Sequence, residues 1–209
     1  MAPSIRPNHL AMTLPYAAVL IGLYWLGSAW VAILLYHAGM GIFLLRCGSS
    51  KQRPGLLQGW SAAAGTVLSV TCAGTGPLLI LLWPTAAGES HNISAILAAF
   101  GLHGGAWWLF AAYYVIVHPL LEEAFWRGAQ FSGHRGVALG DVAFAGYHAL
   151  VLQYFLSPPW VLASVVSLLF VAWIWRRVGA RYGGLAIPVV SHAAAGLSTM
   201  LAAYILARG

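Results

Sequence analysis

The acidic residues of this sequence are few enough to consider one by one. Asp141 is the only aspartate, and Glu89, Glu122 and Glu123 are the only glutamates. Glu122 and Glu123 lie with Arg127 inside a long apolar segment, where each charge costs about 2.5–3.5 kcal/mol to insert at the centre of a bilayer. Ionisable groups in such a position are candidates for function, and carboxylates are frequent carriers of acid–base chemistry.

Helical spacing divides the roles of these charges. Glu123 and Arg127 are four residues apart, so they share one face of a helix and can form an ion pair. Glu122 points about 100° away from Glu123 around the helix axis and is therefore the freer carboxylate. A free carboxylate shielded from water is suited to act as a general base near neutral pH. His118, four residues before Glu122, lies on the same face and is a candidate to line the same cavity.

Two further histidines are expected on neighbouring helices. His148 lies in the apolar segment 137–156, with Phe144 one turn earlier on its face, and His192 lies in the segment 185–206. Two buried imidazoles and a buried carboxylate on three helices could together hold and activate a water molecule. Two other interpretations stay open: each histidine can be a packed, hydrogen-bonded residue, and the charge cluster can belong to a solvated interfacial helix.

The motifs of three known classes of membrane protease are incomplete or absent in this sequence. An aspartyl protease needs two aspartates and this chain has one, and the zinc-protease string His-Glu-x-x-His does not occur. Residues 130–133 (Gln-Phe-Ser-Gly) lack the first glycine of the rhomboid-type motif Gly-x-Ser-Gly. A zinc site made of Glu122, His148 and His192 stays open, because one carboxylate and two imidazoles form a legitimate catalytic set.

The elements that must position these residues are membrane helices. The chain has 209 residues, of which 61% are hydrophobic and 7% charged, and its mean hydropathy is +0.81. Soluble domains carry roughly 25% charged residues, so a soluble globule and a disordered chain are excluded. The net charge of +6 comes from a few basic residues between apolar runs, which indicates membrane topology rather than nucleic-acid binding. At roughly 20 residues per span, we expect an all-α, polytopic membrane bundle of about six transmembrane helices.

The apolar runs set the expected order of spans. The predicted spans are 12–45, 56–83, 104–131, 137–156, 160–175 and 185–206, with the residues just before 104 at the membrane interface. Basic residues cluster in the connections 46–53, 134–135 and 176–181, and the positive-inside rule places these on the cytoplasmic side. With six spans, both termini would lie on the opposite side.

Three motifs occur in order along consecutive predicted spans. They are Glu122-Glu123-Ala-Phe-Trp-Arg127-Gly128, Phe144-Ala-Gly-Tyr-His148, and His192 in the last span. Their order and placement resemble the CPBP family of CAAX proteases and bacteriocin-processing enzymes, also called Abi, which includes the type II CAAX prenyl endopeptidases. The resemblance covers about residues 104–207, so we expect a catalytic core of four helices at 104–209. The N-terminal region, 1–103, carries no motif.

The resemblance implies a glutamic-type intramembrane endopeptidase that uses no metal or other cofactor. By position, Glu122 would deprotonate the attacking water, and His148 would orient and polarise it. Glu123 and Arg127 would hold the motif helix, in agreement with their spacing. His192 would stabilise the oxyanion that develops on the scissile carbonyl, which is usually a large contribution to catalysis.

One position departs from the family pattern. The third motif usually continues His-x-x-x-Asn, whose amide supplies a second oxyanion donor, and the corresponding residue here is Gly196. Loss of one such donor costs about 10²–10³ in rate, unless Ser191, Ser198 or a backbone N–H compensates. Gly196, Phe144 and His118 are predicted to line the substrate cavity.

The function that follows is cleavage of a membrane-tethered peptide or protein, for example a C-terminal tail, a sorting signal or a bacteriocin precursor. The nine arginines against one lysine, with many Ala, Gly and Trp residues, are typical of a GC-rich bacterial genome, and we therefore expect a multi-pass protein of the bacterial inner membrane. Two alternatives stay open: a zinc-dependent membrane protease, and a non-catalytic immunity or scaffold protein of the same fold.

Overall fold

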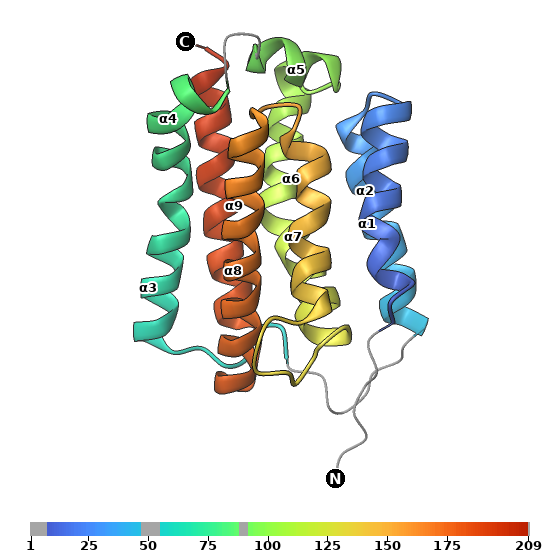
Figure 1. The fold of residues 1–209 in the computed structure, drawn as a ribbon. Helices are drawn as coiled ribbons and strands as arrows, with labels where there is room; N and C mark the ends of the chain where they lie inside the picture. The colour runs from blue at the N-terminus through green and yellow to red at the C-terminus, as the bar shows by residue number, and fades with distance from the viewer. Residues whose placement is uncertain (1–7, 47–54, 88–91, 209) are drawn as a thin grey trace.

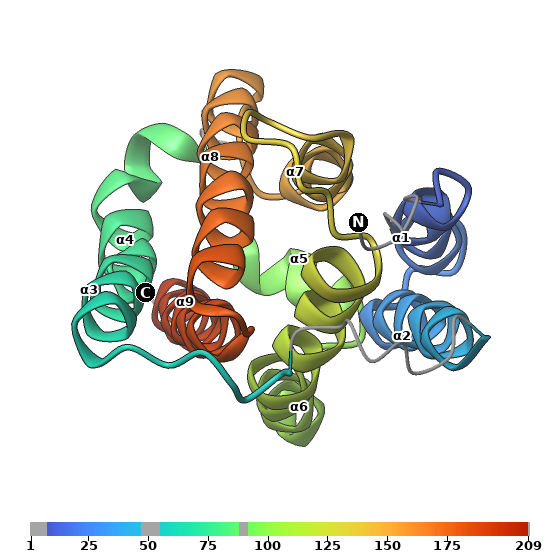
Figure 2. The same cartoon turned by 90° about the horizontal axis from the view of Figure 1, so that it is seen from below.

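The computed structural model of the chain describes residues 8–46, 55–87 and 92–208. Within these ranges the fold is all-α: helices stand side by side in one bundle, and α9 packs against α3, α4, α6 and α8 (Figures 1 and 2). The elements in chain order are η1 (Ala11–Thr13), α1 (Leu14–Val19), η2 (Leu20–Trp25), α2 (Ala29–Arg46), α3 (Ala62–Ala73), α4 (Thr75–Ala86), α5 (Ile93–Ala99), α6 (Gly104–Glu123), η3 (Ala124–Ala129), α7 (Leu139–Leu152), α8 (Pro158–Tyr182) and α9 (Ala186–Leu206).

The helices have the length and composition of membrane spans. Five stretches in the described residues are long and apolar enough to cross a bilayer: Ala29–Arg46, Ala62–Ala86, Gly104–Ala129, Pro158–Tyr182 and Ala186–Leu206. Two shorter apolar stretches, Ala11–Trp25 and Leu139–Leu152, stand among them. The predicted all-α, polytopic membrane bundle is therefore confirmed.

The prediction of one helix over 12–45 is wrong, because this stretch forms a helical hairpin. Its first arm runs from Ala11 to Trp25 and its second arm is α2. The chain reverses at Gly27, whose φ of +59° lies in the left-handed region that glycine adopts without steric cost. No charged residue marks this turn, so the sequence reads as one continuous apolar run.

The hairpin also reverses the expected position of the N-terminal helix. The helical stretch Ala11–Trp25 begins at the same end of the bundle as the basic connections, and α9 ends at the opposite end (Figure 1). The prediction that both termini lie opposite the basic connections is therefore correct for the end of α9 and wrong for the beginning of the N-terminal helical stretch, since the hairpin adds one crossing of the bundle. Lys51, Arg53 and Glu89 lie outside the described residues.

The remaining spans follow the predicted order with two adjustments. The second span is divided at Gly74 into α3 and α4, and α4 approaches α9 closely at Gly76, where a Cβ would lie 2.3 Å from the carbonyl oxygen of Ser198. α8 continues to Tyr182, seven residues beyond the prediction, so the three arginines of the last basic connection belong to its final turns. The span 104–131 corresponds to α6 followed by η3.

An ion pair fixes the connection between η3 and α7. The Arg176 guanidinium of α8 donates to both carboxylate oxygens of Asp141, at 2.7–3.1 Å. It also donates to three backbone carbonyls of the connection, at 2.5–3.0 Å, those of Ser132, His134 and Gly136. Asp141 in turn accepts the N–H of Ala138 at the start of α7. These bonds set where α7 begins relative to η3, and so where the second motif lies relative to the first.

Candidate active site

Glu122 and Glu123 are the last two residues of α6, and both are fully buried. The helix continues as the π-helical turn η3, which carries Arg127. Such turns are rare and are frequently found at functional sites. At 1.5 Å per residue, the glutamates lie roughly 10 Å from the end of the helical stretch at Ala129. They are therefore enclosed by α2, α7 and α9 instead of lying at the surface of the bundle.

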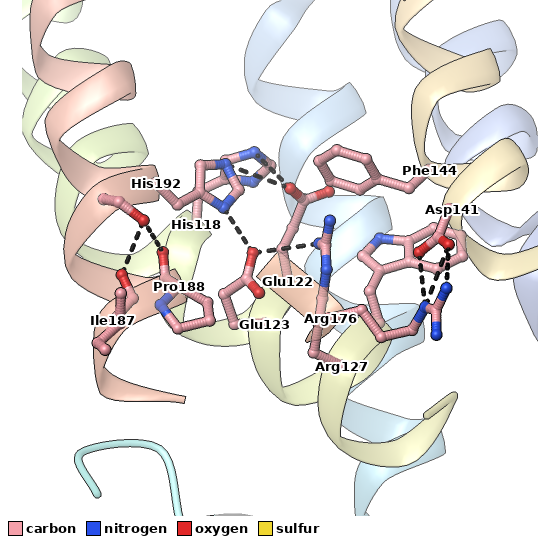
Figure 3. A network of polar contacts seen from close by, with 12 residues as sticks. His118, Glu122, Glu123, Arg127, Asp141, Phe144, Arg176, Ile187, Pro188 and His192 are labelled. Atoms are coloured by element: carbon pink, nitrogen blue, oxygen red, sulfur yellow. Dashed lines mark hydrogen bonds and ion pairs between the residues drawn. The ribbon is translucent and has the colours of Figure 1, made fainter. Parts of the chain in front are cut away.

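Glu123 is held by two partners. Its Oε1 accepts from Arg127 Nη1 at 3.1 Å and lies 2.9 Å from His192 Nδ1 (Figure 3). The guanidinium carbon of Arg127 lies 4.2 Å from the ring centre of Phe144 and 5.1 Å from that of Trp175. The ion pair predicted from the i,i+4 spacing is confirmed, and the π-face of Phe144 supports the buried cation.

The two carboxylate oxygens of Glu122 have different surroundings. Oε1 accepts hydrogen bonds from the hydroxyls of Tyr36, at 2.5 Å, and Tyr147, at 2.6 Å. Oε2 lies 3.3 Å from His118 Nε2 and 3.6 Å from His192 Nε2, and it accepts no hydrogen bond from the described residues. His118 and His192 thus converge on the free side of Glu122 (Figure 3).

The imidazole of His118 continues into a second polar chain. Its Nδ1 lies 3.0 Å from His37 Nε2, and His37 Nδ1 lies 2.7 Å from the hydroxyl of Tyr113. His37 comes from α2, so the hairpin contributes to the surroundings of the site. As the helical spacing predicted, His118 shares the face of Glu122.

His148 lies next to the cluster without touching its carboxylates. Its Nδ1 lies 2.8 Å from the carbonyl oxygen of Phe144, and its ring lies 4.1 Å from the ring of Tyr147, centre to centre. Because a carbonyl only accepts, Nδ1 carries the proton of the neutral ring and Nε2 keeps a lone pair. That nitrogen remains for a water molecule or a substrate.

An apolar cavity of about 260 Å³ adjoins the cluster. Its lining includes the polar side chains of Tyr36, His118, Tyr147 and His148. Apolar side chains from η2, α2, α4, α5, α6, α7 and α9 form most of the remaining wall, including Leu23, Ile33, Trp83, Leu97, Phe110, Val151 and Met200. The cavity extends toward α5, and its chemistry suits an apolar ligand.

Gly196 packs near the ring of Tyr114, and the hydroxyls of the two nearby serines bind backbone groups. A Cβ at Gly196 would lie 3.4 Å from a ring carbon of Tyr114, an ordinary contact. Ser191 Oγ donates to carbonyls of its own helix, those of Ile187 and Pro188. Ser198 Oγ donates to the carbonyl of Ala73 and accepts from the N–H of Gly76. Both hydroxyls are therefore occupied, and the expectation that one of them replaces the missing amide is not supported.

Sequence reasoning missed the two tyrosines that bind Glu122. Tyr147 is adjacent to His148 and could have been noted as part of the second motif. Tyr36 lies in an uninterrupted apolar run, where a single hydroxyl is a weak signal. His37 follows Tyr36 in the same run, and only the structure places it in the second polar chain.

Three atoms of the cluster could also ligate a metal ion. His118, Glu122 and His192 each offer one ligand atom, and these atoms lie within 4.8 Å of one another. The set differs from the predicted zinc ligands by His118 in place of His148. Two of its separations, 3.3 and 3.6 Å, are close to the roughly 3.3 Å expected between tetrahedral zinc ligands at 2.0–2.1 Å.

The comparison with protein families matches the segment that carries Glu122, His148 and His192. Residues 104–198 match the family model described as type II CAAX prenyl endopeptidase Rce1-like. The match covers just under half of the chain and includes all three motifs. No curated protein and no solved structure matches the chain. Residues 104–198 are therefore similar to the type II CAAX prenyl endopeptidases, in agreement with the resemblance that the motifs indicate.

Proposed function

We propose that this protein is a glutamic-type intramembrane endopeptidase in which Glu122 activates water. One observation carries the proposal: Glu122 is fully buried with one carboxylate oxygen unbonded, facing two imidazoles beside an apolar cavity. A buried polar atom without a partner is uncommon. A reacting water molecule would complete its bonding.

In the proposed reaction, Glu122 Oε2 takes one proton from a water molecule while the water oxygen attacks the scissile carbonyl carbon. His148 Nε2 accepts a hydrogen bond from the remaining O–H and so orients the water. The carbonyl oxygen becomes an oxyanion, to which His192 donates from Nε2. Because His192 Nδ1 is engaged by Glu123, this donor requires the imidazolium form. The C–N bond then breaks, and the proton on Glu122 passes to the leaving amine.

The substrate is proposed to be a membrane-tethered peptide or protein with an apolar segment that enters the cavity. A prenylated C-terminal tail is the substrate that the family description suggests, and a sorting signal or a bacteriocin precursor offers the same combination of peptide and membrane anchor. The composition further supports a location in the bacterial inner membrane.

The test is cleavage of a farnesylated peptide with a Cys-aliphatic-aliphatic-X tail by the full chain reconstituted in liposomes. Loss of a general base typically costs 10²–10⁴ in rate. We expect Glu122→Gln to lose activity on that scale, and His148→Ala to lose activity as well. His103→Ala, which removes an exposed imidazole, serves as the control and keeps the wild-type rate. Retained activity in both site variants contradicts the proposal.

A zinc-dependent protease is the second candidate, favoured by the convergence of His118, Glu122 and His192. A bound zinc ion would polarise the scissile carbonyl and lower the energy of a bound hydroxide. Glu122 would then be a ligand and not the base. Metal analysis of the purified protein and activity after chelation decide between the two: full activity in a metal-free, chelated sample excludes zinc.

A further inference from the structure

The carboxylate of Glu122 is bound asymmetrically by two tyrosines from distant parts of the chain. Tyr36 lies in α2, 86 residues before Glu122, and Tyr147 lies in α7, 25 residues after it. Both hydroxyls donate to the same oxygen, Oε1. A carboxylate oxygen has about two lone-pair sites, so Oε1 has no capacity for a further donor.

The direction of one of these donors is itself fixed. The indole N–H of Trp126, in η3, donates to the Tyr36 hydroxyl at 2.8 Å. With its lone pair receiving that bond, Tyr36 presents its own proton to Glu122. Tyr36 and Tyr147 also lie edge to face, with ring centres 5.5 Å apart. The two hydroxyls therefore form a rigid clamp around one carboxylate oxygen.

The other oxygen is left without a hydrogen bond from the described residues. Glu122 Oε2 lies on the side of His118 and His192, at 3.3 and 3.6 Å from their Nε2 atoms. If both oxygens were equivalent, the carboxylate could turn about its last torsion and present either one. The clamp removes that freedom.

We infer that Tyr36 and Tyr147 are positioning residues that select Oε2 of Glu122 as the proton-accepting oxygen. Their hydroxyls act through Glu122, because both donate to Oε1. The inference rests on the proposed function of Glu122 as the general base. It adds that the geometry of this base depends on α2, which lies outside the segment that matches the family model.

The test uses Tyr→Phe variants, which keep the ring and remove only the hydroxyl. Tyr36→Phe and Tyr147→Phe are each expected to lower kcat for the farnesylated peptide about tenfold. The double variant is expected to lower it by about 10²–10³, with KM unchanged throughout. Tyr16→Phe is the matched control, since the Tyr16 hydroxyl donates to a backbone carbonyl of α7, that of Ala143, and not to a carboxylate. It should keep the wild-type kcat.

A purely structural role would lower the unfolding temperature of the tyrosine variants, and would lower the activity only in proportion to the fraction of folded protein. The inference requires kcat to fall while the unfolding temperature stays near that of Tyr16→Phe. If the double variant does not fold, the two single variants decide, and an unchanged kcat in both overturns the inference. An inactive Glu122→Gln together with fully active tyrosine variants overturns only the positioning role. An active Glu122→Gln overturns both proposals.

Discussion

Two clusters of buried charge lie in this bundle, and they differ in how completely their atoms are bonded. In the first, every guanidinium nitrogen of Arg176 donates, and both carboxylate oxygens of Asp141 accept. In the second, around the two glutamates, four atoms find no hydrogen-bond partner among the described residues: His118 Nε2, Glu122 Oε2, Glu123 Oε2 and Arg127 Nη2. Both clusters are almost inaccessible to solvent.

The Arg176 cluster is thus fully bonded, whereas the cluster that we propose to be reactive is not. Buried polar atoms in proteins are nearly always hydrogen-bonded, and an unbonded one costs roughly 1–3 kcal/mol. The Arg176 cluster avoids that cost completely and holds a connection between helices. The glutamate cluster carries that cost at four atoms, which agrees with our proposal that a water molecule and a substrate complete its bonding.

The largest effect on folding is expected from Arg176→Met. The substitution leaves Asp141 buried without its cation and removes the donors to three carbonyls. Breaking a buried ion pair in this way typically costs 3–5 kcal/mol, and we expect a loss of that size in the free energy of unfolding. Unfolding in mixed micelles measures it, with Arg177→Met, at an exposed arginine, as the control. Equal stability of the two variants would contradict the structural role of the cluster.

A smaller loss of stability is expected from Arg127→Met, together with a loss of activity. Arg127 donates to Glu123 alone, and one of its terminal nitrogens has no partner, so about 1–3 kcal/mol is expected. Cleavage should fall about tenfold or more, because Glu123 is then held only by His192. Rate and unfolding are measured on the same preparation. A loss of stability as large as that of Arg176→Met would contradict the expectation that the two clusters contribute differently to the free energy of unfolding.

The smallest change is expected from Gly196→Asn, which adds the amide found in the family motif. The nearest contact of a Cβ at this position is ordinary, at 3.4 Å from the Tyr114 ring, so the helix should accept it. A single oxyanion donor contributes up to about 10²–10³ in rate, and we expect a rise in kcat of about tenfold. Gly196→Ala adds the same Cβ without the amide and should leave kcat unchanged. Equal rates in the two variants would show that the amide is not used.

Contacts within one helix were predictable from the sequence. The i,i+4 spacing identified the Glu123–Arg127 pair and the shared face of His118 and Glu122, since the rise and twist of a helix fix these neighbours. The lack of charged residues identified the membrane, because uncompensated charge is costly there. The order of the three motifs indicated the family whose model matches residues 104–198.

Contacts between helices were not predictable in the same way. The turn at Gly27 is marked by no charged residue, and without it α2 cannot return along α6 and bring Tyr36 to Glu122. The occupied hydroxyls of Ser191 and Ser198 likewise became visible only with the helices in place.

The sequence by itself thus determined a membrane helix bundle and the pairing of Glu123 with Arg127. Only the tertiary structure decided that both glutamates are buried and which oxygen of Glu122 is available. The physical reason is that a helix fixes its own neighbours locally, whereas the donors to Glu122 Oε1 come from two other helices, and their approach depends on packing across the whole bundle.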